Sequence, residues 1–232
     1  MGDIQEKVTE IKKRIATAAE SIGKSSDDII LVAATKMNNA DRVSQAISAG
    51  VDACGENRVQ ELLEKYEKNA YDGAPLHFIG TLQTNKVKYI VGKVDLIHSV
   101  NSLKLAKEIS RIASKQGIVQ KVLIEINIGR EETKSGILPE ELPGILDELD
   151  LLPGLNVCGL MAIPPISVDC EQNKAFFVKM NELFVDNSKK KYDNISMKIL
   201  SMGMSADFEQ AIFCGSNMVR VGTGIFGARN YS

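Results

Sequence analysis

Lys36 follows a run of six apolar residues, Ile29 to Ala34, and its position favours covalent chemistry. Such a run predicts a strand that is buried on both faces, as in a parallel sheet. Ligands of parallel α/β folds bind at the carboxyl ends of the strands, where Thr35 and Lys36 would stand. A lysine there loses its proton more easily than a solvated one, and its neutral amine can form a Schiff base. The simpler interpretation is a solvated surface lysine.

Glycines and hydroxyl residues gather in two later segments, SMGMS (201–205) and RVGTGIFG (220–227). Each follows or overlaps the end of a predicted strand, the seventh and the eighth along the chain. Barrels often bind phosphate after these two strands, because backbone N–H groups beside small residues can approach it closely. The candidate phosphate-binding residues are Ser201, Gly203, Gly222 and Thr223.

The glycines Gly222, Gly224 and Gly227 also match the pattern G-x-G-x-x-G after a predicted strand. A dinucleotide site needs this pattern to open a helix inside a βαβ unit, with an acidic residue about 20 positions further on. The sequence ends at Ser232, so we do not predict a dinucleotide site.

The elements that must position these residues alternate along the chain. Strand-like segments begin at Ile29, Val51, Leu76, Leu96, Lys121, Leu155, Met197 and Met218, with helix-like segments between them. The helical spacing of Ile4, Val8, Ile11 and Ile15 predicts an amphipathic helix before the first strand. This order predicts an α/β fold: a single (β/α)8 TIM barrel with an extra N-terminal helix, one domain over residues 1–232.

The predicted strand at 121–128 places unlike residues on its two faces. Its apolar face, which suits a helix layer, holds Val122, Ile124, Ile126 and Ile128. Glu125 and Asn127 would then point into the barrel, where a carboxylate needs a partner. A satisfied core network is the simpler interpretation, and Arg220 could be the partner of Glu125.

Three other polar residues have simple structural interpretations. Asn57 could cap the helix after the second strand. His77 would be structural because it lies near the start of its strand, and His98 would face the helix layer. Neither histidine has a visible partner for a nucleophilic triad.

Composition excludes several classes of partner. The chain has 30 acidic and 28 basic residues, a net charge of −2, which gives no reason to expect nucleic acid or an anionic membrane as partner. No apolar signal segment or long apolar span is present, so we expect a cytoplasmic protein. The four cysteines, Cys54, Cys158, Cys170 and Cys214, are widely spaced and form no metal-binding pattern with the two histidines. We therefore expect reduced thiols and no metal site.

Several motifs occur in a specific order. They are AATK, GENRVQE, HFIGTLQTNK, the E-x-x-K-S-G of residues 131–136, GLMAIP, LSMGMSADFEQAI and MVRVGTGIFGAR. Together they resemble the YggS/PROSC family, the pyridoxal phosphate homeostasis proteins, from about Ile29 to the end of the sequence. Thr81 stands where His or Pro is common in that family, and Gly224 stands where Ala is common.

The resemblance implies a fold like the barrel domain of alanine racemase, holding pyridoxal 5′-phosphate (PLP). Lys36 matches the lysine that forms the Schiff base with the cofactor. The region that holds the phosphate is matched by Ser201, Gly222 and Thr223. Arg220 matches the residue near the pyridine nitrogen, and Asn57 matches a residue on the rim near the ring.

The match leaves two classes of function open. One is a non-catalytic binder that stores, buffers or delivers PLP, with apo forms of PLP-dependent enzymes as possible acceptors. The other is a small PLP-dependent amino-acid racemase-like enzyme. A Schiff-base aldolase acting on a sugar phosphate would need the same lysine and phosphate site, but the motifs do not match it.

The binder is the preferred interpretation. Racemases of this fold need an acid/base group on each face of the substrate, and alanine racemase takes a tyrosine from an added β-domain across a dimer. This sequence ends ten residues after Gly222, and Tyr231 is the only one of its five tyrosines near a rim motif. We therefore assign no catalytic residue and expect a monomer.

Overall fold

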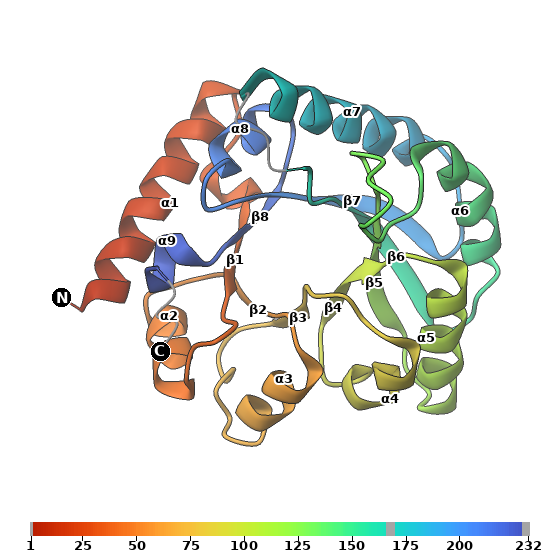
Figure 1. The fold of residues 1–232 in the computed structure, drawn as a ribbon, viewed down its shortest axis with the longest axis horizontal. Helices are drawn as coiled ribbons and strands as arrows, with labels where there is room; N and C mark the ends of the chain where they lie inside the picture. Colours follow the sequence, from red (N-terminus) through yellow and green to blue (C-terminus); the bar gives the residue numbers. More distant parts are fainter. Residues whose placement is uncertain (1, 166–169, 229–232) are drawn as a thin grey trace.

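Eight parallel strands form a closed barrel in the computed structural model, which describes residues 2–165 and 170–228. Each strand pairs with its neighbours along the chain, and β8 pairs with β1 to close the ring (Figure 1). The strands are β1 (Ile30–Ala34), β2 (Ala53–Glu56), β3 (Leu76–Phe78), β4 (Leu96–Val100), β5 (Gln120–Glu125), β6 (Leu155–Met161), β7 (Ile195–Met204) and β8 (Met218–Val221). The predicted barrel is confirmed, and all eight predicted strands are present.

Helices surround this barrel as an outer layer (Figure 1). They are α1 (Asp3–Ser21), α2 (Ala40–Ser48), α3 (Val59–Tyr66), α4 (Val87–Ile90), α5 (Leu103–Lys115), α6 (Leu142–Asp150), α7 (Cys170–Ser188), α8 (Phe208–Phe213) and α9 (Thr223–Phe226). Among the described residues, no helix is long and apolar enough to span a membrane.

The extra N-terminal helix, α1, packs on the outside of the barrel where β1 and β8 meet. Its buried stripe is the predicted one: Ile4, Val8, Ile11 and Ile15. These side chains share an apolar cluster with Leu31 of β1 and Val219 of β8. Arg14 also binds Glu209 of α8 through two hydrogen bonds of 3.0 and 2.6 Å. Helix α1 therefore covers the two strands that end at the candidate site.

Side chains alternate between the inside of the barrel and the helix layer, as the pleat of a strand requires. On β5, Val122 and Ile124 join the large cluster that includes helix residues, whereas Leu123 joins an inner cluster of residues from six strands. The inner cluster is Val32, Ala53, Leu96, Leu123, Cys158, Met161 and Met218. The predicted two faces of this strand are confirmed.

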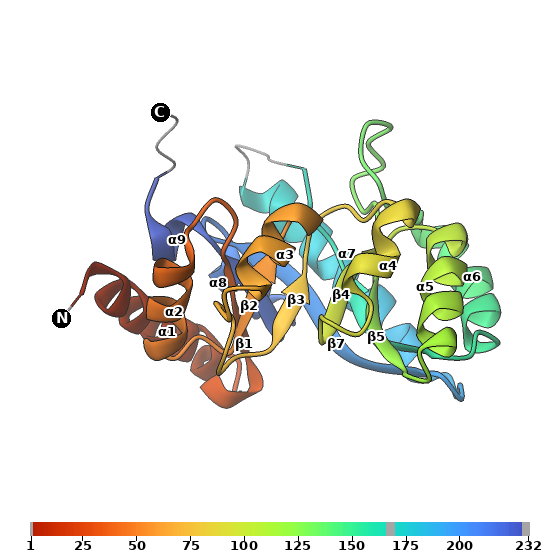
Figure 2. The same ribbon diagram turned by 90° about the horizontal axis from the view of Figure 1, so that it is seen from below.

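The same alternation sets the direction of Lys36. Leu31 and Ala33 pack under α1, Val32 lies inside the barrel, and Thr35 again faces outward to bond Glu56. The next residue, Lys36, stands at the carboxyl end of β1 on the inner side of the rim. Figure 2 shows the barrel from the side, with the loop that follows β5 rising above this rim.

The described thiols are not bridged. Cys54, Cys158 and Cys214 are free, and burial raises the pKa of the Cys54 thiol to about 12. The side chain of Cys170 and all of Tyr231 lie outside the described residues. Within residues 2–165 and 170–228, no group of three His, Cys, Asp or Glu side chains could hold a metal ion.

Candidate functional site

Lys36 lines two adjoining cavities at the carboxyl rim of the barrel, of about 260 and 400 Å3. The smaller one is also lined by Arg220, Gly222 and Thr223. Four of the six residues predicted to bind the cofactor therefore meet at one cavity, although Lys36 and Gly222 are 186 positions apart in the sequence. The first and last strands of the barrel bring them together, because β1 and β8 are paired neighbours.

One wall of the smaller cavity is the turn between β8 and α9. The backbone N–H groups of Gly222 and Gly224 donate to Ser205 Oγ at 3.1 and 3.3 Å. Ser205 itself lines the cavity and belongs to the segment SMGMS. Its hydroxyl accepts the N–H groups of Gly222 and Gly224, whereas only Ser201 of the two serines in this segment was predicted as a site residue. Ser205 directly follows the end of β7 at Met204, which places it at the rim.

Ser201, in contrast, is fully buried inside the barrel. Its Oγ lies 2.5 Å from Nη1 of Arg220 and 3.2 Å from Nδ1 of His98. His98 Nε2 lies 3.1 Å from His77 Nδ1. A guanidinium only donates, so the Ser201 hydroxyl donates to His98, and His98 donates through Nε2–H to His77. Arg220 thus fixes the direction of a hydrogen-bonded chain that leads from the rim into the barrel.

The position of His98 corrects a prediction. The sequence placed it toward the helix layer, but it is fully buried in the barrel interior with Ser201 and His77. Leu96 lies in the inner cluster and Ile97 in the outer one, so alternation along β4 turns His98 inward as well. Burial lowers the pKa of His98 well below its ordinary value and that of His77 to about 4, so both rings are neutral at pH 7.

Arg220 is 5 % exposed and is held by neutral acceptors. Nη1 donates to the Ser201 carbonyl oxygen and Nη2 to the Ala162 carbonyl oxygen, both at 2.9 Å. Burial lowers the pKa of the guanidinium to about 10, whereas the charges of Asp207 and Glu125 raise it. The arginine therefore keeps its positive charge at pH 7 and joins β6, β7 and β8 beneath the cavity.

Glu125 does not complete the predicted core network. Its Oε1 accepts a hydrogen bond of 3.1 Å from Ser135 Oγ, and its Oε2 has no partner among the described residues. Burial raises the pKa of its carboxyl, and Ser135 and Arg220 act in the opposite direction. With Thr81 and Asn127 it lines a separate cavity of about 210 Å3.

Asn57 lies in the loop after β2 and does not line either of the two cavities at Lys36. Its Oδ1 is buried without a partner among the described residues. The helix-cap interpretation is wrong, because α3 begins after Arg58 and no side chain caps it. A Cβ added at Gly80 would collide with the Asn57 carbonyl oxygen, so only glycine lets the loop after β3 approach this closely.

The chemistry of the donors fits a phosphorylated carbonyl compound. The cavity presents one amine and one buried guanidinium, and the turn at Gly222 adds the Ser205 hydroxyl that accepts its N–H. Cations and backbone N–H groups bind phosphate, and an amine can bond a carbonyl carbon. These residues fit PLP.

The barrel and this site define a class of protein. The family model for the alanine racemase N-terminal domain matches residues 8–230. An alanine racemase of Clostridium difficile superposes with a TM-score of 0.70 at 20% identity, covering 98% of this chain and 58% of the racemase. At that identity the likeness shows the fold alone. The protein is thus a barrel of the alanine racemase N-terminal type.

More similar relatives define the family. The pyridoxal phosphate homeostasis protein of Aquifex aeolicus is 44% identical over 226 residues, 97% of this chain and 98% of that protein. The one of Escherichia coli K12 is 37% identical over 236 residues, 100% of this chain and 99% of that protein. PipY of Synechococcus elongatus, solved with PLP bound, has a TM-score of 0.79 and 31% identity, covering 92% of this chain and 100% of PipY. The chain belongs to the family of pyridoxal phosphate homeostasis proteins.

Proposed function

We propose that this protein binds PLP as a Schiff base on Lys36 and stores, buffers or delivers it without catalysing a reaction. The observation that carries the proposal is the rim cavity shared by Lys36, Arg220 and the turn at Gly222 and Thr223. The names of the relatives and the PLP bound to PipY support the same ligand.

The predicted residues differ in their proposed parts. The amine of Lys36 bonds the cofactor, and the turn at Gly222 and Thr223 holds its phosphate together with the Ser205 hydroxyl, which accepts the Gly222 N–H and can donate its own proton. Ser201 does not contact the cofactor in this proposal, because its hydroxyl is fully buried. It accepts a hydrogen bond from Arg220 and so helps to hold the guanidinium in place. Asn57 lies outside both cavities at Lys36, so the proposal gives it no contact with the cofactor.

Arg220 has a chemical consequence for the proposal. When bound, PLP supplies an electron sink, and this sink is strong only if the pyridine nitrogen is protonated. An arginine near that nitrogen cannot accept its proton, and the hydrogen-bond acceptors of Arg220 among the described residues are neutral oxygens. The ring would stabilise a carbanion poorly, which suits a protein that holds the cofactor.

A racemase-like enzyme is the alternative, because a racemase needs only modest carbanion stabilisation. We expect holo-protein incubated with a range of L-amino acids in D2O to show no exchange of the α-proton at an enzyme-like rate. Exchange followed by NMR is the measurement, with the Lys36→Ala protein and free PLP as controls. Exchange at enzyme-like turnover that needs Lys36 would contradict the carrier.

Delivery is the finer part of the proposal. We propose apo forms of PLP-dependent enzymes as acceptors, a monomeric carrier, and the cytoplasm as its location. Transfer of cofactor to an apo-enzyme faster than from an equal concentration of free PLP would support delivery. Transfer at the rate of release into solution would leave storage or buffering as the function.

A further inference from the structure

The backbone beside Lys36 is held in an unusual conformation. The next residue, Met37, has a φ of +61°, which side-chain-bearing residues rarely adopt, and its side chain is 61% exposed. No glycine relieves this conformation, and the exposed side chain of Met37 offers little packing to hold it. Other groups must therefore stabilise the turn that carries Lys36.

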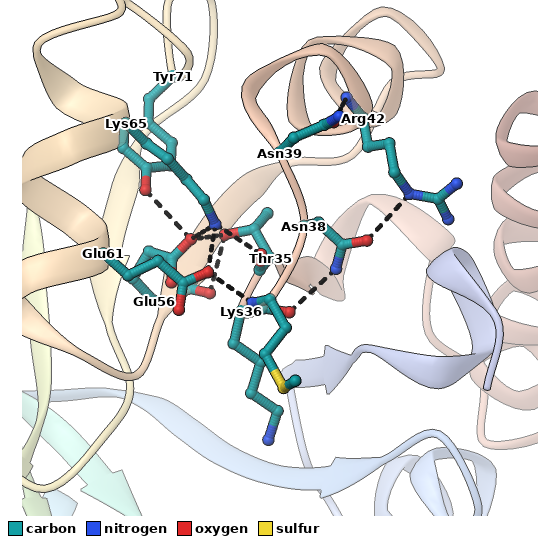
Figure 3. Close-up of polar contacts among 11 residues, drawn as sticks. Thr35, Lys36, Asn38, Asn39, Arg42, Glu56, Glu61, Lys65 and Tyr71 are labelled. Carbon is teal, nitrogen blue, oxygen red and sulfur yellow. Dashed lines mark hydrogen bonds and ion pairs between the residues drawn. The ribbon is translucent and has the colours of Figure 1, made fainter. Parts of the chain in front are cut away.

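Two side chains of α3 bind the peptide groups on either side of Lys36. Lys65 Nζ donates to the Thr35 carbonyl oxygen at 2.8 Å, which belongs to the preceding peptide. The Met37 N–H, in the following peptide, donates to Glu61 Oε1 at 2.5 Å. Figure 3 shows both contacts, with the Lys36 side chain pointing away from them.

The second peptide is also held from α2. Asn38 Nδ2 donates to the Lys36 carbonyl oxygen at 3.0 Å, and Asn38 Oδ1 accepts from Arg42 Nε at 3.0 Å (Figure 3). The Lys36–Met37 peptide thus has its N–H bound to Glu61 and its C=O bound to Asn38. Both of its hydrogen-bonding groups are fixed by side chains.

Glu61 is itself anchored in a buried cluster behind β1. Lys65 lies 2.7 Å from Glu61 Oε1 and 2.6 Å from Glu56 Oε1, and Glu56 also accepts from Thr35 and Tyr71 at 2.6 and 3.1 Å. Glu56 is 0% exposed and Lys65 is 6% exposed, so this cluster cannot move as solvated side chains do. It lies on the outer side of the barrel wall and does not line either rim cavity at Lys36.

We propose that Glu61 is a positioning residue for Lys36: its carboxylate, held by Lys65, stabilises the positive φ of Met37 and so directs the Lys36 amine to the rim cavity. This inference rests on the proposed bond between Lys36 and PLP. It assigns Glu61 no contact with the cofactor. The cluster also keeps two carboxylates occupied by Lys65, and a carboxylate beside the Lys36 amine would favour its charged, unreactive form.

The test is a double-substitution cycle. Glu61→Ala should slow capture of PLP by about tenfold, followed by stopped-flow absorbance, because a charge-assisted hydrogen bond is lost. Met37→Gly permits a positive φ without help. In the Met37→Gly background, the effect of Glu61→Ala should therefore shrink to about twofold. Glu61→Gln keeps an acceptor for the Met37 N–H and should restore most of the wild-type rate.

Glu64→Ala is the matched control, since Glu64 is an exposed glutamate of the same helix that pairs only with Gln60 in the described structure. It should capture PLP at the wild-type rate. The inference would be overturned if Glu61→Ala captured PLP at the wild-type rate. It would also be overturned if Glu61→Ala slowed capture as much in the Met37→Gly background as in the wild type. Failure of the wild-type protein to attach PLP at Lys36 would instead overturn the proposed function.

Discussion

Arg220→Ala is expected to lower the free energy of unfolding by about 3–5 kcal/mol, as the removal of a fully buried hydrogen-bonded charge does. The guanidinium satisfies the carbonyl oxygens of Ser201 and Ala162 and the Ser201 hydroxyl. The Ser201 carbonyl oxygen would keep the Ala162 N–H at 3.1 Å, but the Ala162 carbonyl oxygen and the Ser201 hydroxyl would lose the donor that Arg220 supplies. The measurement is urea unfolding of the apo-protein at pH 7.

Arg111→Ala is the matched control. Arg111 makes two hydrogen bonds of 2.8 Å to Glu108, but it lies on the exposed face of α5. We expect its unfolding midpoint to stay close to that of the wild type. Equal midpoints for Arg220→Ala and Arg111→Ala would contradict the structural role assigned to Arg220.

Lys65→Met is expected to lower the free energy of unfolding at pH 7 by about 3–5 kcal/mol. The substitution leaves the Glu56 carboxylate buried without its cation. Burial already raises the pKa of Glu56, while Lys65 lowers it. Removing Lys65 should raise this pKa further. The unfolded chain then binds fewer protons than the folded chain, so stability should fall as pH rises through the folded pKa and recover toward pH 5.

The matched variant is Lys65→Met combined with Glu56→Gln, which removes the charge that is left behind. It should be more stable than Lys65→Met at pH 7 and should lose the pH dependence that Glu56 introduces. Urea unfolding of both variants between pH 5 and 8 measures this. If Lys65→Met lost the same free energy of unfolding, relative to the wild type, at pH 5 and at pH 8, the Glu56 charge would not be the cause of the loss.

Much of the fold could be predicted because its signals are local. The apolar run at 29–34 marks β1, and the alternation at 122–125 marks the inner and outer faces of β5. The spacing of Ile4, Val8 and Ile11 marks α1. Each pattern lies within one element, so the pairing of strands need not be known.

The misses depend on contacts between elements. Leu96 and Ile97 are both apolar, so only the packing of β4 shows that Leu96 and His98 share its inner face. Ser205 is distinguished by the N–H groups of Gly222 and Gly224, which follow a different strand. The cluster of Glu56, Glu61 and Lys65 reaches the backbone of residues 35–37 from a different element, and a methionine at a positive φ gives no sequence signal.

Lys36 therefore has two distinct environments. Its side chain faces a cavity with Arg220 and the turn at Gly222, and its backbone is bound from behind by Glu61 and Lys65. The first environment could be predicted from the glycines of residues 201–205 and 220–227 and from the resemblance to the pyridoxal phosphate homeostasis proteins. The second is visible only in the folded chain, and it explains how an exposed turn can hold one lysine in a defined direction.

Reduction of the holo-protein with borohydride, followed by mass mapping of its peptides, tests the central claim most directly. We predict that the reduced cofactor is found on Lys36, and that Lys36→Ala loses both the label and the absorption of the bound cofactor. A label on another lysine of the wild type, or an unchanged absorption in the Lys36→Ala protein, would contradict the assignment of Lys36 as the site that holds PLP.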